Sequence, residues 1–417
     1  MDLRRLIASR PLTAAALAVA GGIVLGFGLA LGLGNITAVT PPPSPPPPVS
    51  PPPIAAVATT RLAAVSFGDL AGWQDDGLSD LMPALSRSCA RIAKSGDEAV
   101  GTGPAARPAA DWKSACAKVT AAGDDPAALR RAIEDAFVPH RISAPAGEDG
   151  TFTGYYEATL NGSLSPTERY KYPLYAPPAD LISVAIKDFA PGVSADGLPA
   201  TLVGRVDGRR LKPYDVRADI DADAFRDRAM PIVWIDDPVA VHILHIQGSG
   251  QVILPDKTMI RVGFAAHNGH AFTGLGKILL DEGVLKPGEA SMIGVRDWLL
   301  KNPARAAALM NKNARYIFFR RIDGDGPIGA EGVALTRLRS LAVDPRTVPL
   351  GAPVWVETKD PDGESLNRLM MAQDVGAAIL GAVRGDVFWG AGDAAFDKAA
   401  RMKSKGRAAV LLPRGRP

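Results

Sequence analysis

The sequence predicts a mostly β protein with peripheral helices, in which short strands form a barrel or a sandwich. After residue 140, short apolar runs rich in Val, Ile, Tyr and Phe alternate with Gly, Pro, Asn and Asp turn residues. Before residue 140, apolar residues recur at helical spacing instead. The expected strands are residues 152–157, 173–175, 181–184, 201–206, 231–235, 241–246, 252–254, 259–264, 316–319, 333–335, 341–343, 353–356, 375–379 and 387–389.

Length and charge exclude some classes of function. The 417 residues, 47% of them hydrophobic, are enough for a large core and more than one domain. A net charge of +3, with no long Lys/Arg run after the N-terminus, argues against a nucleic-acid partner. Neither a P-loop nor a G-x-G-x-x-G turn after a strand is present, so the sequence offers no nucleotide-binding motif.

The N-terminus predicts a membrane anchor. Residues 12–33 are uncharged and would form a helix about 33 Å long, which is enough to cross a hydrocarbon core of about 30 Å. Arg4, Arg5 and Arg10 place residues 1–11 in the cytoplasm. A cleaved signal peptide is the alternative for this segment. We expect a transmembrane anchor over residues 12–35 and a semi-rigid proline-rich linker over residues 36–57.

Helices are expected at the start of the folded part and again near residue 290. Asp76 is available as the N-cap of the first helix, and Asp125 with Pro126 as the start of the third. The expected helices are residues 78–93, 112–119, 126–137, 275–282 and 291–301.

The chain has only two cysteines, Cys89 and Cys116. In an exported domain they can pair and close a loop of about 28 residues. Because no histidine accompanies them in the sequence, a zinc site is disfavoured. We interpret them as a structural disulfide.

Two polar loops could contact a ligand. Gln247, Gly248 and Ser249 form one of them, and Asn268 and His270 belong to the other. Their neutral donors and acceptors suit hydroxyl and amide groups, and glycine allows close approach to the backbone. The simpler interpretation is that both loops are hairpin turns. A metal site lacks an evident third ligand, and a serine hydrolase lacks the G-x-S-x-G turn.

Near the C-terminus, residues 370–392 carry two acids, Asp374 and Asp386, at the edges of short apolar runs and beside glycines. A buried carboxylate must be paired, hydrogen-bonded or protonated, so this arrangement suggests acid–base chemistry. Asp also caps turns without any further role, and residue types alone leave the two interpretations open.

Several ordered motifs resemble one family. The chain resembles the membrane-bound lytic murein transglycosylase A family, and residues 370–392 resemble its terminal three-aspartate (3D) module, with Asp344 as the third acid. Many family members carry a lipidated cysteine, whereas this chain has an apolar segment and a proline-rich linker. The motifs that carry the resemblance are residues 152–157, 245–250, 268–270, 313–320, 342–351 and 370–392.

The resemblance implies a double-psi β-barrel with an inserted smaller β-barrel domain and a groove between them. The catalytic domain would be discontinuous, made of residues 58–157 and 321–417. Residues 158–320 would form the inserted substrate domain.

The resemblance also implies an enzyme: a lyase-type peptidoglycan lytic exotransglycosylase. It would cleave the β-1,4 bond between N-acetylmuramic acid and N-acetylglucosamine and leave 1,6-anhydromuramic ends. Asp386 would act as acid and then base, Asp374 would support it, and Asp344 would be structural. The residues expected to position sugars are Tyr155, Gln247, Gly248, Ser249, Asn268 and His270.

Two other functions remain open from the sequence. A glycoside hydrolase would use Asp374 and Asp386 as a pair acting on water. A non-catalytic cell-wall-binding scaffold would use the anchor and linker alone. The expected location is the periplasmic face of the membrane, and the expected partners are glycan strands and, if any, proteins of cell-wall synthesis or division. No metal or organic cofactor is implied.

Overall fold

The computed structural model describes residues 60–189, 201–222, 225–324 and 326–415. The expected anchor and the proline-rich linker lie outside these residues. Within the described ranges, no helix is both long enough and apolar enough to cross a membrane.

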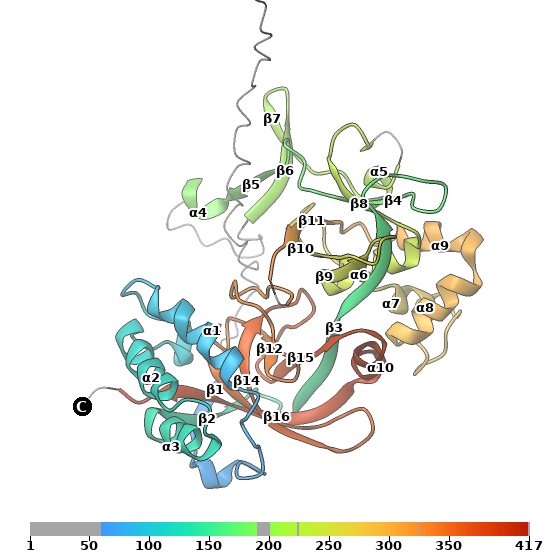
Figure 1. Ribbon diagram of the computed structural model, residues 1–417. Helices are drawn as coiled ribbons and strands as arrows, with labels where there is room; N and C mark the ends of the chain where they lie inside the picture. The colour runs from blue at the N-terminus through green and yellow to red at the C-terminus, as the bar shows by residue number, and fades with distance from the viewer. Residues whose placement is uncertain (1–59, 190–200, 223–224, 325, 416–417) are drawn as a thin grey trace, which may run out of the picture. The chain divides into compact units, whose positions relative to one another are not determined.

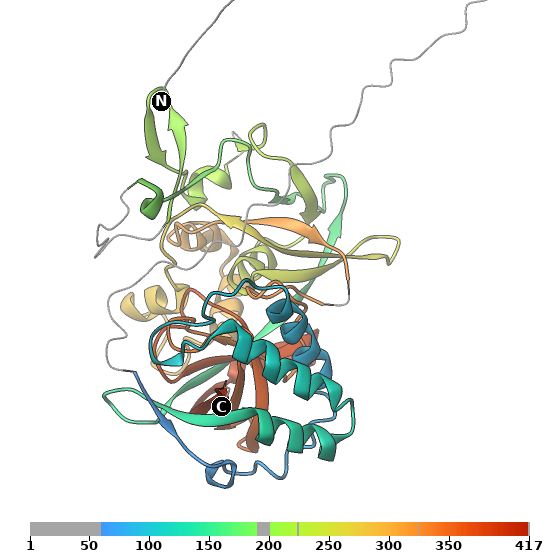
Figure 2. The same cartoon turned by 90° about the vertical axis from the view of Figure 1, so that its left-hand side faces the viewer.

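Most of the described chain is β structure, arranged as Figures 1 and 2 show. The strands are β1 (Arg61–Ala64), β2 (Phe137–Ser143), β3 (Gly150–Ser163), β4 (Tyr172–Tyr175), β5 (Ile182–Ala185), β6 (Thr201–Asp207), β7 (Arg210–Pro213), β8 (Pro231–Ile235), β9 (Ser249–Ile253), β10 (Met259–His267), β11 (Ile317–Ile322), β12 (Ser340–Val343), β13 (Pro353–Lys359), β14 (Ser365–Asp374), β15 (Arg384–Ala391) and β16 (Lys403–Pro413).

The helices lie around these strands (Figure 1). They are α1 (Met82–Ala93), α2 (Ala109–Ala121), α3 (Pro126–Ala136), α4 (Ile186–Phe189), α5 (Arg217–Ile220), α6 (Pro238–Gln247), α7 (Leu275–Asp281), α8 (Met292–Lys301), α9 (Pro303–Met310) and α10 (Asp393–Arg401), with two short 3-10 turns at Phe67–Asp69 and Gly103–Ala105.

Strand order brings the two ends of the chain together. Among the described residues, the main sheet runs β1-β2-β16-β13-β14-β12-β15-β3-β9-β10-β11. Strand β16 also pairs with β3, so the path from β16 through β13, β14, β12 and β15 to β3 returns to its start. The long strand β3 also pairs with β9 and β8. It thereby joins the C-terminal strands to those of the central part of the chain (Figure 1).

Helices α1, α2 and α3 pack beside the C-terminal strands (Figure 1). Asp125 caps α3 by accepting a hydrogen bond from the Ala128 amide, with Pro126 at the first helical position, as the sequence predicts. Leu129 and Ile133, one turn apart, face the core. This part of the core is rich in large aromatic side chains, and Trp73, Trp112 and Trp355 are almost completely buried.

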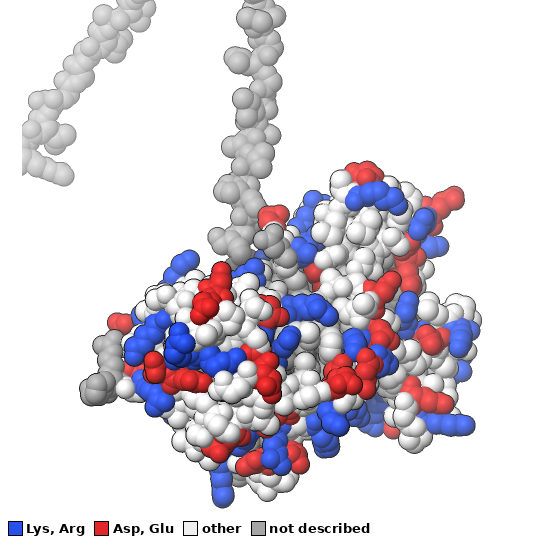
Figure 3. Space-filling model, turned by 60° about the horizontal axis from the view of Figure 1, so that its bottom comes forward, with Lys and Arg blue, Asp and Glu red and all other residues white. Residues whose placement is uncertain are grey.

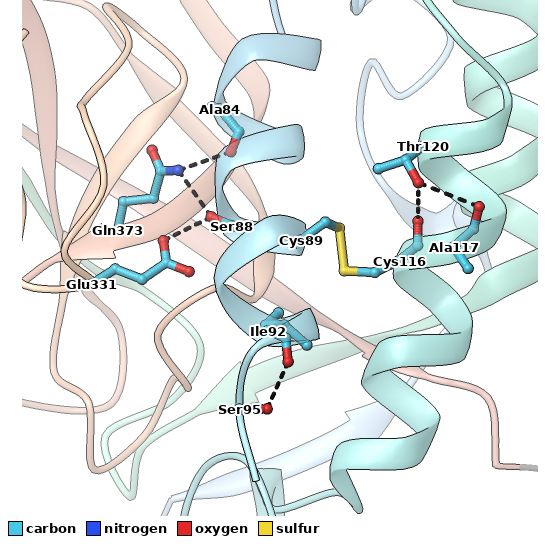
Figure 4. Close-up of a disulfide and its surroundings, with 10 residues drawn as sticks. All are labelled: Ala84, Ser88, Cys89, Ile92, Ser95, Cys116, Ala117, Thr120, Glu331 and Gln373. Atoms are coloured by element: carbon cyan, nitrogen blue, oxygen red, sulfur yellow. Dashed lines mark hydrogen bonds between the residues drawn. A yellow bond between two sulfur atoms is a disulfide. The ribbon is translucent and has the colours of Figure 1, made fainter. Parts of the chain in front are cut away.

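A disulfide joins α1 to α2: Cys89 is bonded to Cys116 (Figure 4). Both cysteines are buried in the same core cluster as the helix faces around them. The two cysteines are 27 residues apart in the sequence, and the bond between them holds the two helices together.

The surface shown in Figure 3 carries basic and acidic side chains side by side rather than in regions of one sign. Many of the charges are paired, as in the ion pair of Arg401 with Asp397 on α10. Exposed pairs of this kind contribute at most about 1 kcal/mol each, so the surface charges do little to hold the fold together.

One strand prediction is wrong because the segment is a helix. Residues 241–246 belong to α6, which begins at Pro238, directly after Asp237, and ends at Gln247, directly before Gly248. Asp237 accepts from the Val239 amide, and Gly248 takes the left-handed conformation, with φ of 79°, that ends many helices. A short apolar run cannot be assigned to strand or helix by its periodicity alone, and these two signals at its ends were missed.

Two further strand predictions are also wrong. Residues 333–335 form only an isolated bridge, between Ile328 and Ala334. Residues 375–379 form a turn in which the Ile379 amide donates to the Gly376 carbonyl. The helix α9 was not expected.

Asp76 is not a helix cap. Helix α1 begins at Met82, and the Asp76 carboxylate instead receives two hydrogen bonds, of 2.6 and 2.7 Å, from the guanidinium of Arg339. Both side chains are buried, so each charge depends on the other for compensation. The partners lie 263 residues apart, which no local sequence pattern can indicate.

Candidate active site

Asp374 and Asp386 come together across one intervening strand. Asp374 is the last residue of β14, and Asp386 lies within β15. These two strands do not pair with each other, because β12 runs between them. Ala342 of β12 is the register partner of both: of Asp374 in the parallel pairing and of Asp386 in the antiparallel one. The two acids therefore lie on either side of one strand and belong to one site.

Asp374 is held by three donors. Its Oδ1 accepts from the amides of Ala330 and Val375, each at 2.9 Å, and its Oδ2 accepts from the Tyr155 hydroxyl at 3.0 Å. Burial raises the pKa of Asp374 to about 6, although these three hydrogen bonds act in the opposite direction. The carboxylate is thus fixed in orientation by groups that favour its ionised form.

Asp386 is held more loosely. Among the described residues its one hydrogen bond comes from Thr153, whose hydroxyl donates to Oδ1 at 2.5 Å. Burial raises the pKa of Asp386 to about 6; the Thr153 bond and the charge of Arg384 oppose this rise, and the charge of Asp374 adds to it. Since Oδ2 is not engaged, it is available to exchange a proton with a bound molecule.

Tyr155 links the acids to an apolar cluster. Its ring packs against Phe388 with a centroid distance of 5.2 Å, and both belong to a cluster with Leu335 and Ala342. Burial, and then the charges of Asp374 and Asp386, raise the pKa of Tyr155 well above its ordinary value. The residue therefore acts as a neutral hydrogen-bond donor at Asp374.

Sequence reasoning missed three groups at this site: the Ala330 amide, Thr153 and Arg384. Arg384 donates to the Thr153 hydroxyl at 2.9 Å, so Thr153 accepts from an arginine while it donates to Asp386. One signal was available: Thr153 and Tyr155 are two residues apart in an expected strand, so both face the same side.

The glycine-containing loop at the end of α6 lies beside β3. The side-chain oxygen of Gln247 accepts from the Tyr156 amide at 3.2 Å, which places this loop next to the strand that carries Thr153 and Tyr155. Ser249 is buried at the start of β9.

The second polar loop is mainly structural. Asn268 is buried; its amide nitrogen donates to the carbonyls of Asp215 and Ala314, and its oxygen accepts from the Tyr316 amide. Through these bonds the Asn268 side chain joins its loop to the backbone at residues 215, 314 and 316. His270 is partly exposed, and its Nε2 donates to the Tyr214 carbonyl at 2.8 Å.

The third acid, Asp344, is buried and paired with Arg346. Its carboxylate also accepts from the Gly381 amide at 2.8 Å. Burial alone would raise the pKa of Asp344, but the hydrogen bonds from Arg346 and Gly381 hold it below its ordinary value. Asp344 thus fastens the turn at Gly381, between β14 and β15.

Among the described residues there is no metal-binding cluster, and a surface hollow lies away from the acid pair. In the part of the chain that the structure describes, no three His, Cys, Asp or Glu side chains are placed to share a metal ion. A hollow of about 670 Å³ lies over β13 and β16, lined by Glu357, Asp360, Arg401 and Lys405 among others, and neither aspartate borders it.

Comparison with known proteins gives consistent matches. A family model described as "MltA specific insert domain" matches residues 151–320, and one described as "3D domain" matches residues 339–412. The crystal structure of MltA from Neisseria gonorrhoeae is 32% identical, covers 90% of this chain and 99% of its own, and has a TM-score of 0.74. A membrane-bound lytic murein transglycosylase from Agrobacterium tumefaciens is also 32% identical, covers 85% and 98%, and has a TM-score of 0.75.

A curated relative matches over a shorter span. The membrane-bound lytic murein transglycosylase A of Escherichia coli (strain K12) is 28% identical over 268 residues, which is 62% of this chain and 65% of that protein. The match thus spans slightly less than two thirds of that relative's length.

Proposed function

This chain belongs to the membrane-bound lytic murein transglycosylase A family, and from that premise we propose that it is a lytic transglycosylase of peptidoglycan. It cleaves the β-1,4 bond between N-acetylmuramic acid and N-acetylglucosamine and leaves a 1,6-anhydromuramic end. The relatives named for this activity match over most of their length, and the acids that the chemistry needs lie together in one site.

The observation that carries this proposal is the unequal bonding of the two acids. Three donors hold Asp374, whereas one holds Asp386, whose Oδ2 stays available. Asp386 is therefore assigned as the single proton shuttle and Asp374 as a fixed negative charge. With a pKa of about 6, Asp386 can hold a proton near neutral pH and release it within one reaction cycle.

The reaction then needs no second general acid or base. Protonated Asp386 gives its proton to the glycosidic oxygen as the bond from that oxygen to C1 of the muramic residue breaks. Positive charge develops at C1, and the nearby Asp374 carboxylate stabilises it. The 6-hydroxyl oxygen of the same sugar bonds to C1, and its proton passes to the Asp386 carboxylate, which regenerates the acid.

For the fold, we propose a double-psi β-barrel made of residues 58–157 and 321–417, with residues 158–320 inserted as a second, smaller β-barrel domain and a groove between the two. The closed pairing path from β16 back to β3 supports the first barrel. The family model for an insert domain, matched at residues 151–320, supports the insertion.

For sugar binding, we propose residues near the acids and on the inserted part: Tyr155, Gln247, Gly248, Ser249, Asn268 and His270. Tyr155 borders Asp374 directly, and Gln247 is bonded to the strand that carries Thr153 and Tyr155. Such groups orient hydroxyl and N-acetyl groups.

For location, we propose the periplasmic face of the membrane, with an N-terminal anchor. Peptidoglycan, the proposed substrate, lies outside the cytoplasm, and the relatives are named membrane-bound. Glycan strands are the proposed partner.

Product analysis tests the function. Sacculi digested with the full chain should release muropeptides that mass spectrometry identifies as 1,6-anhydro species, which are 18 Da lighter than the hydrolysed form by the mass of one water. Reducing ends would show that water is the nucleophile and that the two acids act as a hydrolase pair. Binding without release of muropeptides would indicate a non-catalytic scaffold.

A further inference from the structure

A buried carboxylate outside the reacting pair, Glu331, lies in the segment between β11 and β12. It is 7% exposed, and its Oε2 accepts from the Ser88 hydroxyl of α1 at 2.7 Å. Its Oε1 is buried and, among the described residues, has no hydrogen-bond partner. A Cβ on Gly351, where φ is 87°, would lie 2.8 Å from Oε1, so the glycine provides the space for this carboxylate. An acid placed so unfavourably needs an explanation.

The backbone around Glu331 holds the end of β14. The Glu331 amide donates to the Gln373 carbonyl at 3.0 Å, and the preceding amide, of Ala330, donates to the Asp374 carboxylate at 2.9 Å. Because these two amides are consecutive, any displacement of Glu331 also displaces the donor that orients Asp374.

The side chains around Glu331 form a hydrogen-bond network (Figure 4). The protonation state of Glu331 affects this network. The Gln373 side-chain nitrogen donates to the Ser88 hydroxyl and to the Ala84 carbonyl, each at 2.9 Å. Ser88 thus has its own proton free to donate to an ionised Glu331. A proton on the unpartnered Oε1 would leave Oε2 as a neutral acceptor, and the bond from Ser88 would be weaker than the charge-assisted one.

We propose that Glu331 is a positioning residue of the reaction: through Ser88 and the two amides of residues 330 and 331, it holds Asp374 in place beside Asp386. The inference rests on the proposed function and adds to it a group that touches neither substrate nor reacting atom.

The charge state of Glu331 changes near neutral pH. Burial raises the pKa of Glu331 to about 7, although the Ser88 bond, the charge of Arg91 and the Gln373 side chain oppose the rise. The other charged groups that face this segment are Arg87, which bonds the Ala334 carbonyl, and Asp374 itself. The strength with which Ser88 holds Glu331 therefore changes near neutral pH.

Two variants of the full chain test this role by their kcat over pH. Glu331→Gln retains an oxygen that can accept from Ser88 but carries no charge, whereas Glu331→Ala removes the contact. We expect Glu331→Ala to lower kcat at every pH by up to about 100-fold, with little change in KM, since misplacement by about 1 Å costs that much. Glu331→Gln should match the wild type below about pH 6 and have a kcat about tenfold lower above about pH 8.

The matched control is Glu157→Gln, which removes another buried carboxylate, one paired with Arg261 at 2.6 Å. It should lower the Tm without making the kcat ratio of variant to wild type depend on pH. A ratio for Glu331→Gln that stays constant across the pH range would assign Glu331 a structural role only and overturn the proposal.

A second readout needs no activity. In the NMR spectrum of the wild-type chain, the Ala330 amide should show an inflection near pH 7 that Glu331→Gln lacks. If the wild type has no such inflection, the inference is wrong whatever the enzyme makes. If the inflection is present but sacculi yield no anhydro products, the proposed function fails and the link from Glu331 to Asp374 stands.

Discussion

Thr153 and Tyr155, two residues apart on one face of β3, each hold one of the two aspartates. Thr153 donates to Asp386, and Tyr155 donates to Asp374. Neighbouring strands lie about 4.8 Å apart, so the Cα atoms of the two acids, on either side of β12, are about 10 Å apart. A single strand thus sets the orientation of both carboxylates, and substitutions on β3 can perturb them separately.

Removing Asp386, the proposed proton shuttle, should prevent most cleavage and leave binding to sacculi unchanged. Asp386→Asn keeps the size of the side chain, but the amide cannot exchange a proton with the substrate. We expect release of soluble muropeptides to fall by about 10²- to 10⁴-fold, which is the usual contribution of a general acid–base. Pelleting with sacculi should be unchanged. Wild-type turnover in this variant would assign the shuttle to another residue.

The same substitution should change stability in a pH-dependent way. In the folded state Asp386 keeps its proton up to about pH 6, whereas in the unfolded chain it loses it near its ordinary pKa of about 3.9. The folded state therefore binds more protons between these values, and the contribution of Asp386 to stability falls as pH rises through this window. Asp386→Asn should match the wild-type Tm at pH 3.5 and exceed it at pH 8. An equal or lower Tm at pH 8 would contradict the raised pKa.

Thr153→Val should shift the pH profile. The variant loses the hydroxyl that favours ionised Asp386, so the pKa of Asp386 rises further. Since the protonated form is the acid, the fall of kcat/KM at higher pH should move to still higher pH. Thr159→Val, at an exposed position on the same strand, is the matched control and should leave the profile unchanged. A shift to lower pH would show that Thr153 does not act through this bond.

Loss of the disulfide should lower stability. In the chain-entropy model, a crosslink across 27 residues contributes about 3 to 4 kcal/mol by restricting the unfolded chain. The double variant Cys89→Ser with Cys116→Ser should show that loss in chemical denaturation, with a higher m-value because the unfolded chain without the crosslink exposes more surface. Reduction of the wild type should reproduce it. No change in either case would mean that the helix packing alone fixes α1 and α2.

The outcome of the sequence predictions follows from the range over which each signal acts. Most short strands were placed correctly because their apolar patterns are local, whereas α6 was mistaken for a strand because an apolar run of that length fits both structures. Motif resemblance identified Asp374 and Asp386, but not that Ala342 lies between them. The sequence around Arg384 and Glu331 did not indicate their places in the site, because the tertiary fold alone brings Thr153 and Ser88 to them.

The bond between Thr153 and Asp386 joins residues 233 positions apart. Strand β3 pairs with β15 and β16, and both are synthesised more than 200 residues after it. Contacts of such high contact order form slowly and late. A chain synthesised only as far as β14 therefore contains α1, α2 and α3 but lacks Asp386, so the proposed wall-cleaving activity would arise only after β15 and β16 have been added.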